Sequence, residues 1–145
     1  MKAVVLEKIG DSKDAFSIKE VDEPSALEED EVLIEVEAFG LNFADVMARR
    51  GLYNDAPPLP SILGYDVVGK VRKSGAQGGD FLIGKRVVAM TRFGGYAQWA
   101  KTKISGVAVI GEKMQAFEAS ALATQYCTAY YACCEAANLF ESEKI

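Results

Sequence analysis

Alternation of apolar and polar positions runs through the first hundred residues and predicts a series of short strands. The segment 31–38 shows the pattern best, because apolar side chains occupy every second position and glutamates occupy most positions between them. That period of two is typical of a strand with one buried face. Comparable runs predict further strands at residues 2–7, 16–21, 62–73, 85–90, 96–101 and 107–110. Glycines separate many of these runs, so the pattern favours a mainly β domain, either a sandwich or an irregular barrel.

A short helix is predicted at residues 43–50, between the third and fourth of these strands. Asn42 is a favourable N-cap residue, and Asp45 stands at the third helical position, where an acidic side chain supports the cap. Asp45 and Arg49 are four positions apart and are expected to pair on the helix surface. The apolar side chains expected to pack inward are those of Phe43, Val46 and Met47.

Residues 115–139 form a second helical region of a different character. This stretch contains neither glycine nor proline, is rich in alanine, and carries only two charged residues, Glu118 and Glu135. A helix that is apolar on all sides is expected to be buried on all sides, whereas a β domain covers only one face of it. We therefore expect the rest of the helix to be covered by another domain, another subunit or a further part of the chain.

The composition is that of one globular domain and excludes several classes of function. The chain has 145 residues and a formal net charge of −5, and its basic residues form no stripe of the kind that binds nucleic acid. No apolar run approaches the roughly 18 residues of a membrane span, and the first residues lack the apolar core of a signal peptide. Histidine is absent altogether. Ser-His-Asp and Cys-His hydrolase sites, and zinc sites with a histidine ligand, are therefore excluded within this chain.

The three cysteines, Cys127, Cys133 and Cys134, lie close together late in the chain. An odd number of clustered cysteines is not a disulfide framework and indicates a reducing compartment, so we expect a cytoplasmic protein. We expect these side chains to be small buried apolar groups rather than metal ligands, because one helix offers poor tetrahedral geometry for three thiolates.

Several motifs in a fixed order carry a family resemblance. The most specific covers residues 42–53 and reads N-F-A-D-x-x-x-R-x-G-L-Y; a proline-rich loop follows, and then G-Y-D-V-V-G at residues 64–69. Weaker motifs are F-L-I-G-K-R-V at residues 81–87, G-G-Y-A-Q-W-A at 94–100 and T-A-Y-Y at 128–131. In order and spacing, these motifs together resemble the medium-chain dehydrogenase/reductase family, and within it the zinc-independent quinone oxidoreductases, the zeta-crystallin-like group.

The resemblance implies a fold and a domain organisation. Residues 1–114 are expected to form a GroES-like, partly open β-barrel, which is the catalytic domain in that family. Residues 115–145 are expected to be connecting helices that lead to a Rossmann cofactor domain. The glycine-rich G-x-G-x-x-G fingerprint of such a domain does not occur in these 145 residues. We therefore expect the chain to be a fragment, the catalytic half of a longer enzyme, and to be inactive alone.

The resemblance also implies chemistry without a metal. In zinc-dependent relatives, a cysteine near the position of Asn42 and the histidine of a G-H-E motif hold the catalytic zinc; here that motif reads Gly64-Tyr65-Asp66. No zinc is therefore expected, and Asp66 is expected to have a structural role. The implied reaction is hydride transfer from NADPH to a quinone or another electron-poor enone, in which the cofactor carries the chemistry and the protein supplies positioning and electrostatics.

The site residues follow from the same resemblance. Tyr53 and Asn42 are implied as catalytic residues. Asn42 would be a polar group near nicotinamide and substrate, while the Tyr53 phenol would hydrogen-bond the substrate carbonyl or supply the proton after the hydride arrives. From the residues alone, three alternatives stay open: Asn42 serves only as a helix cap, Tyr53 anchors the proline loop, and Thr128 bonds back to its own helix.

The remaining implied residues surround these two. Thr128 would lie beside the nicotinamide, Asp45 and Arg49 would orient the site, and Met47 would make the pocket more apolar where some relatives carry a tyrosine. A different class of function also remains open. A freestanding GroES-like module without catalytic activity would bind partners or oligomerise by burying the apolar helix of residues 115–139.

Overall fold

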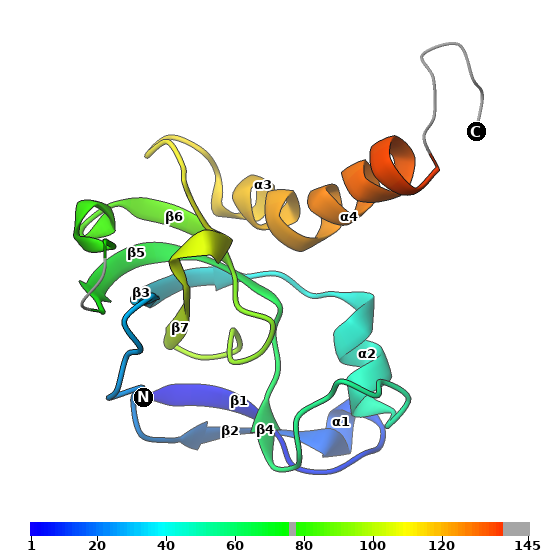
Figure 1. Cartoon of the computed structure of the whole chain (residues 1–145). Helices are drawn as coiled ribbons and strands as arrows, with labels where there is room; N and C mark the ends of the chain where they lie inside the picture. Colours follow the sequence, from blue (N-terminus) through cyan, green and yellow to red (C-terminus); the bar gives the residue numbers. More distant parts are fainter. Residues whose placement is uncertain (76–77, 138–145) are drawn as a thin grey trace.

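Two antiparallel sheets form the body of the computed structural model, which describes residues 1–75 and 78–137 (Figure 1). The smaller sheet contains β2 (Phe16–Glu20), β1 (Lys2–Leu6) and β4 (Ser61–Ile62), in that order. The larger sheet contains, in order, β7 (Trp99–Lys103), β3 (Glu31–Phe39), β5 (Asp66–Ser74), β6 (Arg86–Met90) and β8 (Val107–Val109). A bridge between Ala3 and Ala97 links the two sheets. The predicted mainly β architecture is confirmed.

The main core lies on one face of the larger sheet. Strands β3 and β5 pair antiparallel along almost their whole length, with one register shift at Arg72 of β5 and another at Glu37 of β3. Their alternation of apolar and polar positions directs one row of side chains inward, which is what the sequence pattern predicts for a half-buried sheet. The buried cluster consists of Val32, Ile34, Val67, Val71, Leu82, Val87, Ala89 and Ala100.

Most predicted strands are present, but two differ in extent. The run predicted as one strand at residues 62–73 is divided into β4 and β5, because Gly64 takes a φ of +104° and turns the chain between them. The strand predicted at 96–101 begins later, as β7 at Trp99–Lys103. Two short helices complete this part of the fold: α1 (Ser12–Ala15) and α2 (Phe43–Arg49), the second of which lies within the predicted range 43–50.

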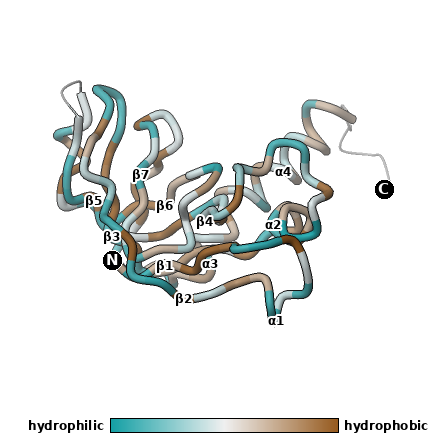
Figure 2. The backbone as a smooth tube through the Cα atoms, turned by 90° about the horizontal axis from the view of Figure 1, so that it is seen from below, coloured by the Kyte–Doolittle hydropathy of each residue, from teal (hydrophilic) through white to brown (hydrophobic). Residues whose placement is uncertain are grey.

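The C-terminal helical region begins on the larger sheet and leaves it. It consists of α3 (Ala116–Ala121), a π-helical segment Leu122–Tyr126, α4 (Cys127–Tyr130) and a second π-helical segment Tyr131–Ala136. Ala119 and Ala123 pack on Val68 and Val88 of the sheet. Figure 1 and Figure 2 both place the far end of this region away from the two sheets. Residues 138–139, at the end of the helix predicted at 115–139, lie outside the described residues.

Only one face of this helical region is covered, so its predicted burial on all sides is not found in this chain. The sheet reaches just the small alanines of one stripe, and the large side chains project elsewhere. The exposed large side chains of the region are Phe117, Leu122, Tyr126, Tyr130 and Tyr131. The predicted burial of the cysteines is wrong for the same reason, since Cys127 and Cys134 are exposed and Cys133 is half-buried. In the described part of the chain, no helix is long and apolar enough to cross a membrane.

Arg86 fastens the start of the helical region to the sheet. Its guanidinium pairs with Glu37 through two hydrogen bonds of 2.8 and 2.9 Å, and it donates to the backbone carbonyls of Gly111 and Met114 at 3.2 and 2.7 Å. Because one planar cation holds both Glu37 of β3, two strands away in the sheet, and the connector, it fixes where the helix begins.

Replacing Arg86 by glutamine is therefore expected to release the connector. The amide keeps part of the side-chain volume but loses the charge and the forked donor set, so the connector carbonyls lose their common partner. Hydrogen exchange should show faster exchange at residues 114–119 with little change in β3 and β5. Equal protection in Arg86→Gln and in the unaltered chain would contradict this assignment.

Candidate functional site

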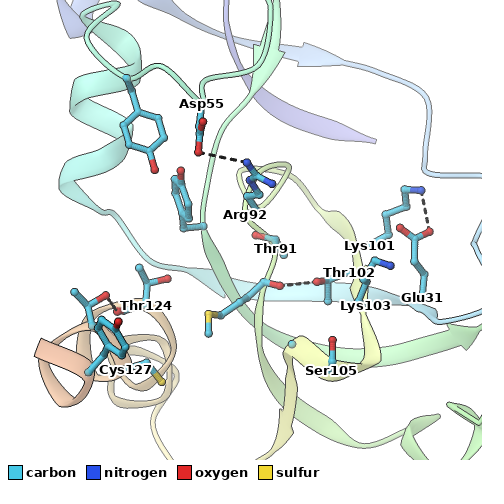
Figure 3. A pocket seen from close by; sticks show the side chains of 16 residues that line it. Glu31, Asp55, Thr91, Arg92, Lys101, Thr102, Lys103, Ser105, Thr124 and Cys127 are labelled. Atoms are coloured by element: carbon cyan, nitrogen blue, oxygen red, sulfur yellow. Dashed lines mark hydrogen bonds and ion pairs between the residues drawn. The ribbon is translucent and has the colours of Figure 1, made fainter. Parts of the chain in front are cut away.

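A cavity of about 830 Å³ lies between the larger sheet, the loop after α2 and the C-terminal helix. Figure 3 shows that its lining side chains come from segments far apart in the sequence. The cavity brings together Tyr53 and Thr128, two of the residues that the sequence assigns to the site. Asn42, Asp45, Met47 and Arg49 do not line it.

Three aromatic rings form a continuous wall beside the cavity. The ring of Tyr53 meets that of Tyr65 edge to face, with centroids 6.2 Å apart and planes at 86°. Tyr65 also packs on Phe93, at a centroid distance of 5.3 Å. Such pairs hold rings in defined orientations. Tyr53 packs against the core cluster around Leu63 and Tyr96 as well, so it both anchors its loop and reaches the cavity.

Tyr65 is a candidate site residue that the sequence reasoning did not assign. Burial raises the pKa of its phenol, and a side-chain hydrogen bond with Tyr53 raises the pKa further. A phenol with a raised pKa stays protonated and remains a hydrogen-bond donor. The signal was visible in the sequence, because Tyr65 occupies the position at which zinc-dependent relatives carry their histidine ligand.

Behind this wall, a buried polar cluster fixes the start of α2. The Asp45 carboxylate accepts hydrogen bonds from the backbone amides of Asn42 at 3.0 Å and Gly64 at 3.2 Å. The Asn42 side-chain amide donates to one carboxylate oxygen of Asp66 at 2.9 Å. Asp66 is fully buried, and its other oxygen has no hydrogen-bond partner within the described residues. Asn42 thus stabilises a buried carboxylate, a role beyond that of a cap.

Tyr96 joins the same cluster from the segment between β6 and β7. Burial raises the pKa of its phenol, and the carboxylates of Asp45 and Asp66 raise it further because they disfavour a nearby phenolate. The cluster therefore places a protonated phenol beside two buried carboxylates. Asp66 has the structural role that the sequence implied, since it holds Asn42 rather than facing the cavity.

Three expectations for helix α2 are corrected by its packing. Arg49 donates to the backbone carbonyl of Gly10 and does not pair with Asp45, whose carboxylate is engaged by backbone amides. Phe43 points outward with 72% of its surface exposed, because Asp45 and Ala48 occupy the buried face of the helix. Met47 is half-buried and does not contribute to the cavity wall. Satisfaction of backbone amides by Asp45 decides the orientation of this helix.

The C-terminal helix supplies the opposite wall of the cavity. Four of its residues line the cavity at helical spacing: Thr124, Cys127, Thr128 and Tyr131. The Thr128 hydroxyl donates to the backbone carbonyl of Thr124 at 2.5 Å, so it does bond back to its helix while facing the cavity. The Thr124 hydroxyl is buried and has no partner within residues 1–75 and 78–137. A buried polar atom without a partner is rare in a folded protein and marks a place for a ligand group or a water.

Paired charges lie at two places along the cavity. At one end Lys101 pairs with Glu31 at 2.9 Å and Lys103 with Asp30 at 2.8 Å; on the side of Tyr65, Arg92 reaches Asp55 at 3.4 Å. Arg92 is largely exposed and also contributes to the cavity lining. Each of these cations has an acidic partner, so the charges make the cavity polar without a strong net field.

Glu31 makes the stability of its end of the cavity dependent on pH. Burial alone would raise its pKa, but hydrogen bonds from the Glu28 backbone amide and the Lys101 ammonium lower the pKa below its ordinary value of 4.5. A carboxylate whose pKa is lower in the folded state contributes stability that is complete above the unfolded pKa and is lost as the pH falls through the folded pKa.

We therefore expect the midpoint of urea unfolding to fall as the pH drops below about 4.5, the unfolded pKa of this glutamate. Glu31→Gln should flatten that part of the pH dependence, because the amide does not titrate. A variant with the full acid slope of the unaltered chain would show that Glu31 contributes nothing to it.

The residues present offer no metal centre in the described part of the chain, where no three side chains among His, Cys, Asp and Glu gather closely enough to hold an ion. What the cavity does offer is hydroxyl groups. Tyr53 and Tyr65 from the barrel and Thr128 from the helix line it, together with Met90. Such a set can orient a carbonyl group and deliver a proton to it.

Comparison with known proteins gives consistent matches. Residues 28–142 match the family model of the alcohol dehydrogenase GroES-like domain. This match extends across the boundary expected between residues 114 and 115. That domain boundary therefore stays a prediction. Among curated proteins, a highly-reducing polyketide synthase of Aureobasidium melanogenum is 36% identical to this chain over 124 residues. The aligned region covers 86% of this chain and 5% of that protein.

Two solved structures show the same fold over almost the whole chain. The human synaptic vesicle membrane protein VAT-1 homolog-like protein superposes with a TM-score of 0.90 at 33% identity, covering 97% of this chain and 45% of that one. The quinone oxidoreductase from Thermus thermophilus, determined also in complex with NADPH, superposes with a TM-score of 0.77 at 33% identity. The superposition covers 95% of this chain and 41% of that one. The chain thus spans less than half the length of each relative.

Proposed function

This chain belongs to the medium-chain dehydrogenase/reductase family, as a GroES-like domain of the quinone oxidoreductase and VAT-1 group, and we propose that it is the substrate-side half of an NAD(P)H-dependent quinone or enone reductase. One observation carries the proposal. A single cavity joins the phenol of Tyr53, from the barrel, to the hydroxyl of Thr128, from the connecting helix. These are the two groups that the family resemblance implies beside the substrate and beside the nicotinamide.

The cavity also fits the nicotinamide end of the cofactor. The Thr124 hydroxyl is buried and unpartnered within the described residues, on the cavity wall, and Thr128 lies one turn further along the same face. A nicotinamide carboxamide offers both a donor and an acceptor, so it would satisfy the orphaned hydroxyl. Thr124 and Thr128 would therefore hold this group. When bound, the cofactor supplies a hydride to the substrate.

The chain's own residues then orient and protonate the substrate. The Tyr53 hydroxyl donates a hydrogen bond to the carbonyl oxygen, which polarises the carbonyl and fixes its distance from the opposite wall. As the hydride adds, the same hydroxyl gives its proton to the oxygen, and water returns a proton to the phenolate. The rings of Tyr65 and Phe93 hold Tyr53 in place and exclude water from one side.

A fusion enzyme tests this function. Residues 1–145 would be joined to the nucleotide-binding domain of the Thermus thermophilus quinone oxidoreductase, and NADPH consumption would be followed with and without a quinone. We expect quinone-dependent oxidation by the fusion and none by the chain alone. Tyr53→Phe should lower kcat by about a hundredfold, within the range of general acid catalysis.

Binding of NADPH separates a failed design from a failed proposal. A fusion that binds NADPH and keeps the fold of this domain, yet oxidises no NADPH with any of several quinones and enones, would refute the proposed function. Tyr126→Phe is the matched control, because its phenol is exposed and does not line the cavity. It should leave kcat unchanged.

A binding or oligomerisation module without catalysis is the second candidate. The observation that favours it is the row of exposed aromatic side chains on the C-terminal helix, including Phe117, Tyr126 and Tyr130. Light scattering distinguishes the candidates. A stable oligomer of the chain that persists in the fusion would favour the module, whereas self-association that disappears in the fusion would favour a helix covered by the cofactor domain.

A further inference from the structure

Tyr65 occupies the cavity wall directly beside Tyr53, and its position suggests a specific task. We propose that Tyr65 is a positioning residue: its hydroxyl donates to the Tyr53 oxygen and thereby directs the Tyr53 hydroxyl toward the substrate carbonyl. The inference rests on the proposed function, since it concerns the same cavity and the same carbonyl substrate.

The geometry of the two rings makes this arrangement specific. Their planes are nearly perpendicular at 86°, with centroids 6.2 Å apart, so one ring edge meets the other ring's face. Both residues line the cavity. Because Phe93 packs on Tyr65 at 5.3 Å, the Tyr65 ring is held between two aromatic neighbours and has little freedom to turn away.

The backbone of Tyr65 is equally fixed. Its carbonyl accepts the backbone amide of Thr91 at 2.8 Å. The preceding residue, Gly64, donates to the buried Asp45 carboxylate at 3.2 Å and accepts the Thr91 hydroxyl at 2.8 Å. Three hydrogen bonds thus fix two consecutive residues, one of which reaches the same buried carboxylate that caps helix α2. Tyr65 is therefore placed as rigidly as a core residue, although it faces a cavity.

The contact between the two rings and the burial of Tyr65 fit the proposed direction. Burial favours the protonated form of Tyr65 and raises its pKa, so its hydroxyl is available as the donor to the Tyr53 oxygen. The other groups acting on Tyr65 are the Asp45 carboxylate, which raises its pKa, and the Arg92 guanidinium, which lowers it. Burial is the largest contribution and keeps Tyr65 protonated.

The proposed hydrogen bond from Tyr65 matters when Tyr53 gives its proton to the substrate. When its O–H bond breaks and a new O–H bond forms on the substrate oxygen, the negative charge left on Tyr53 is stabilised by the hydrogen bond from Tyr65. Tyr65 keeps its own proton throughout, and water restores the proton of Tyr53. The hydride comes from the cofactor named in the proposed function, so electrons and protons balance without any other reactant.

Ligand binding to the 145-residue chain tests the inference without any cofactor. The probe is tetramethyl-1,4-benzoquinone, whose substituted ring blocks addition of the exposed Cys127 thiol in the cavity. Its Kd would be measured by NMR titration for the chain, Tyr53→Phe, Tyr65→Phe and the double variant. We expect about a tenfold weaker Kd in Tyr53→Phe and about a threefold weaker Kd in Tyr65→Phe, the sizes typical of one neutral hydrogen bond and of its indirect support.

The decisive result is whether the effect of Tyr65→Phe on Kd depends on the presence of the Tyr53 hydroxyl. If Tyr65 acts through Tyr53, its substitution should have no further effect on Kd in the Tyr53→Phe background. Equal threefold effects in both backgrounds, or no binding of the quinone to the unaltered chain, would overturn the inference. Tyr126→Phe serves as the matched control and should bind as the unaltered chain does.

The fusion enzyme separates this inference from the function on which it rests. There Tyr65→Phe should lower kcat about tenfold and change KM little, because the interaction strengthens as charge develops on Tyr53. An active fusion in which Tyr65→Phe retains full kcat would refute the role of Tyr65 and leave the function intact. An inactive fusion that binds NADPH and keeps its fold, together with a coupled quinone Kd, would refute the function and leave the pairing of the two phenols intact.

Discussion

Gly69→Ala is expected to unfold the domain. Gly69 lies in the middle of β5, paired with Val36 of β3 on one side and Val87 of β6 on the other. An added Cβ would stand 2.1 Å from the Glu35 carbonyl oxygen and 2.7 Å from the side chain of Ile34. The nearest atom is backbone of a central strand, so relief requires separating β3 from β5. We expect a loss of more than about 4 kcal/mol, beyond the usual range for one substitution.

Urea unfolding and circular dichroism measure this effect, and Gly111→Ala is its control. A Cβ added at Gly111 would have no neighbouring atom within 4 Å, and the backbone there is not left-handed, so alanine should be accepted. A folded Gly69→Ala with a urea midpoint close to that of Gly111→Ala would show that β3 and β5 approach less closely than described. The expected outcome is a soluble Gly111→Ala and a Gly69→Ala without cooperative unfolding.

Asn42→Ala is expected to cost about 3 kcal/mol, the upper range for leaving a buried polar group unsatisfied. The substitution removes the only side-chain amide that donates to Asp66 among the described residues, and both carboxylate oxygens would then be buried without a partner. The loss should appear as a lower urea midpoint with an unchanged slope, because the surface exposed on unfolding hardly changes.

Two further variants identify the cause of that loss. Leu41→Ala changes the preceding residue, whose side chain is exposed, and should have little effect on stability. Asp66→Asn should reduce the cost of Asn42→Ala, since an unpartnered amide is less expensive to bury than an unpartnered carboxylate. Equal costs of Asn42→Ala in the unaltered chain and in the Asp66→Asn background would assign the effect to the lost helix cap instead.

The fold could be predicted largely because its determinants are local. Alternation identified β3 and most other strands, and capping residues located α2, since both patterns act within a few positions of the chain. Prediction failed where a distant contact decides the outcome. Arg49 turns to the carbonyl of Gly10, and Phe43 faces outward because Asp45 occupies the inner side of α2. No pattern within residues 43–50 contains those partners.

The candidate site was predictable only in part for the same reason. Tyr53 and Thr128 were assigned through motifs, and the fold brings them to one cavity. In the sequence, Tyr65 indicates only that a metal ligand is absent, whereas in the fold its ring contacts place it beside Tyr53. The orphaned hydroxyl of Thr124 has no signature in the sequence, since it depends on how the π-helical segment turns that side chain.

The C-terminal helix is attached to the larger sheet near its first residues. Arg86, Ala119 and Ala123 hold one end on the sheet, while the large side chains further along, Tyr126, Tyr130 and Tyr131, are exposed. A small rotation at the attached end moves the far end of the helix by a larger distance. The width of the cavity beneath the helix therefore depends on the contacts of Arg86, Ala119 and Ala123. Substitutions near Arg86 can therefore retune what the cavity admits without touching a single residue that lines it.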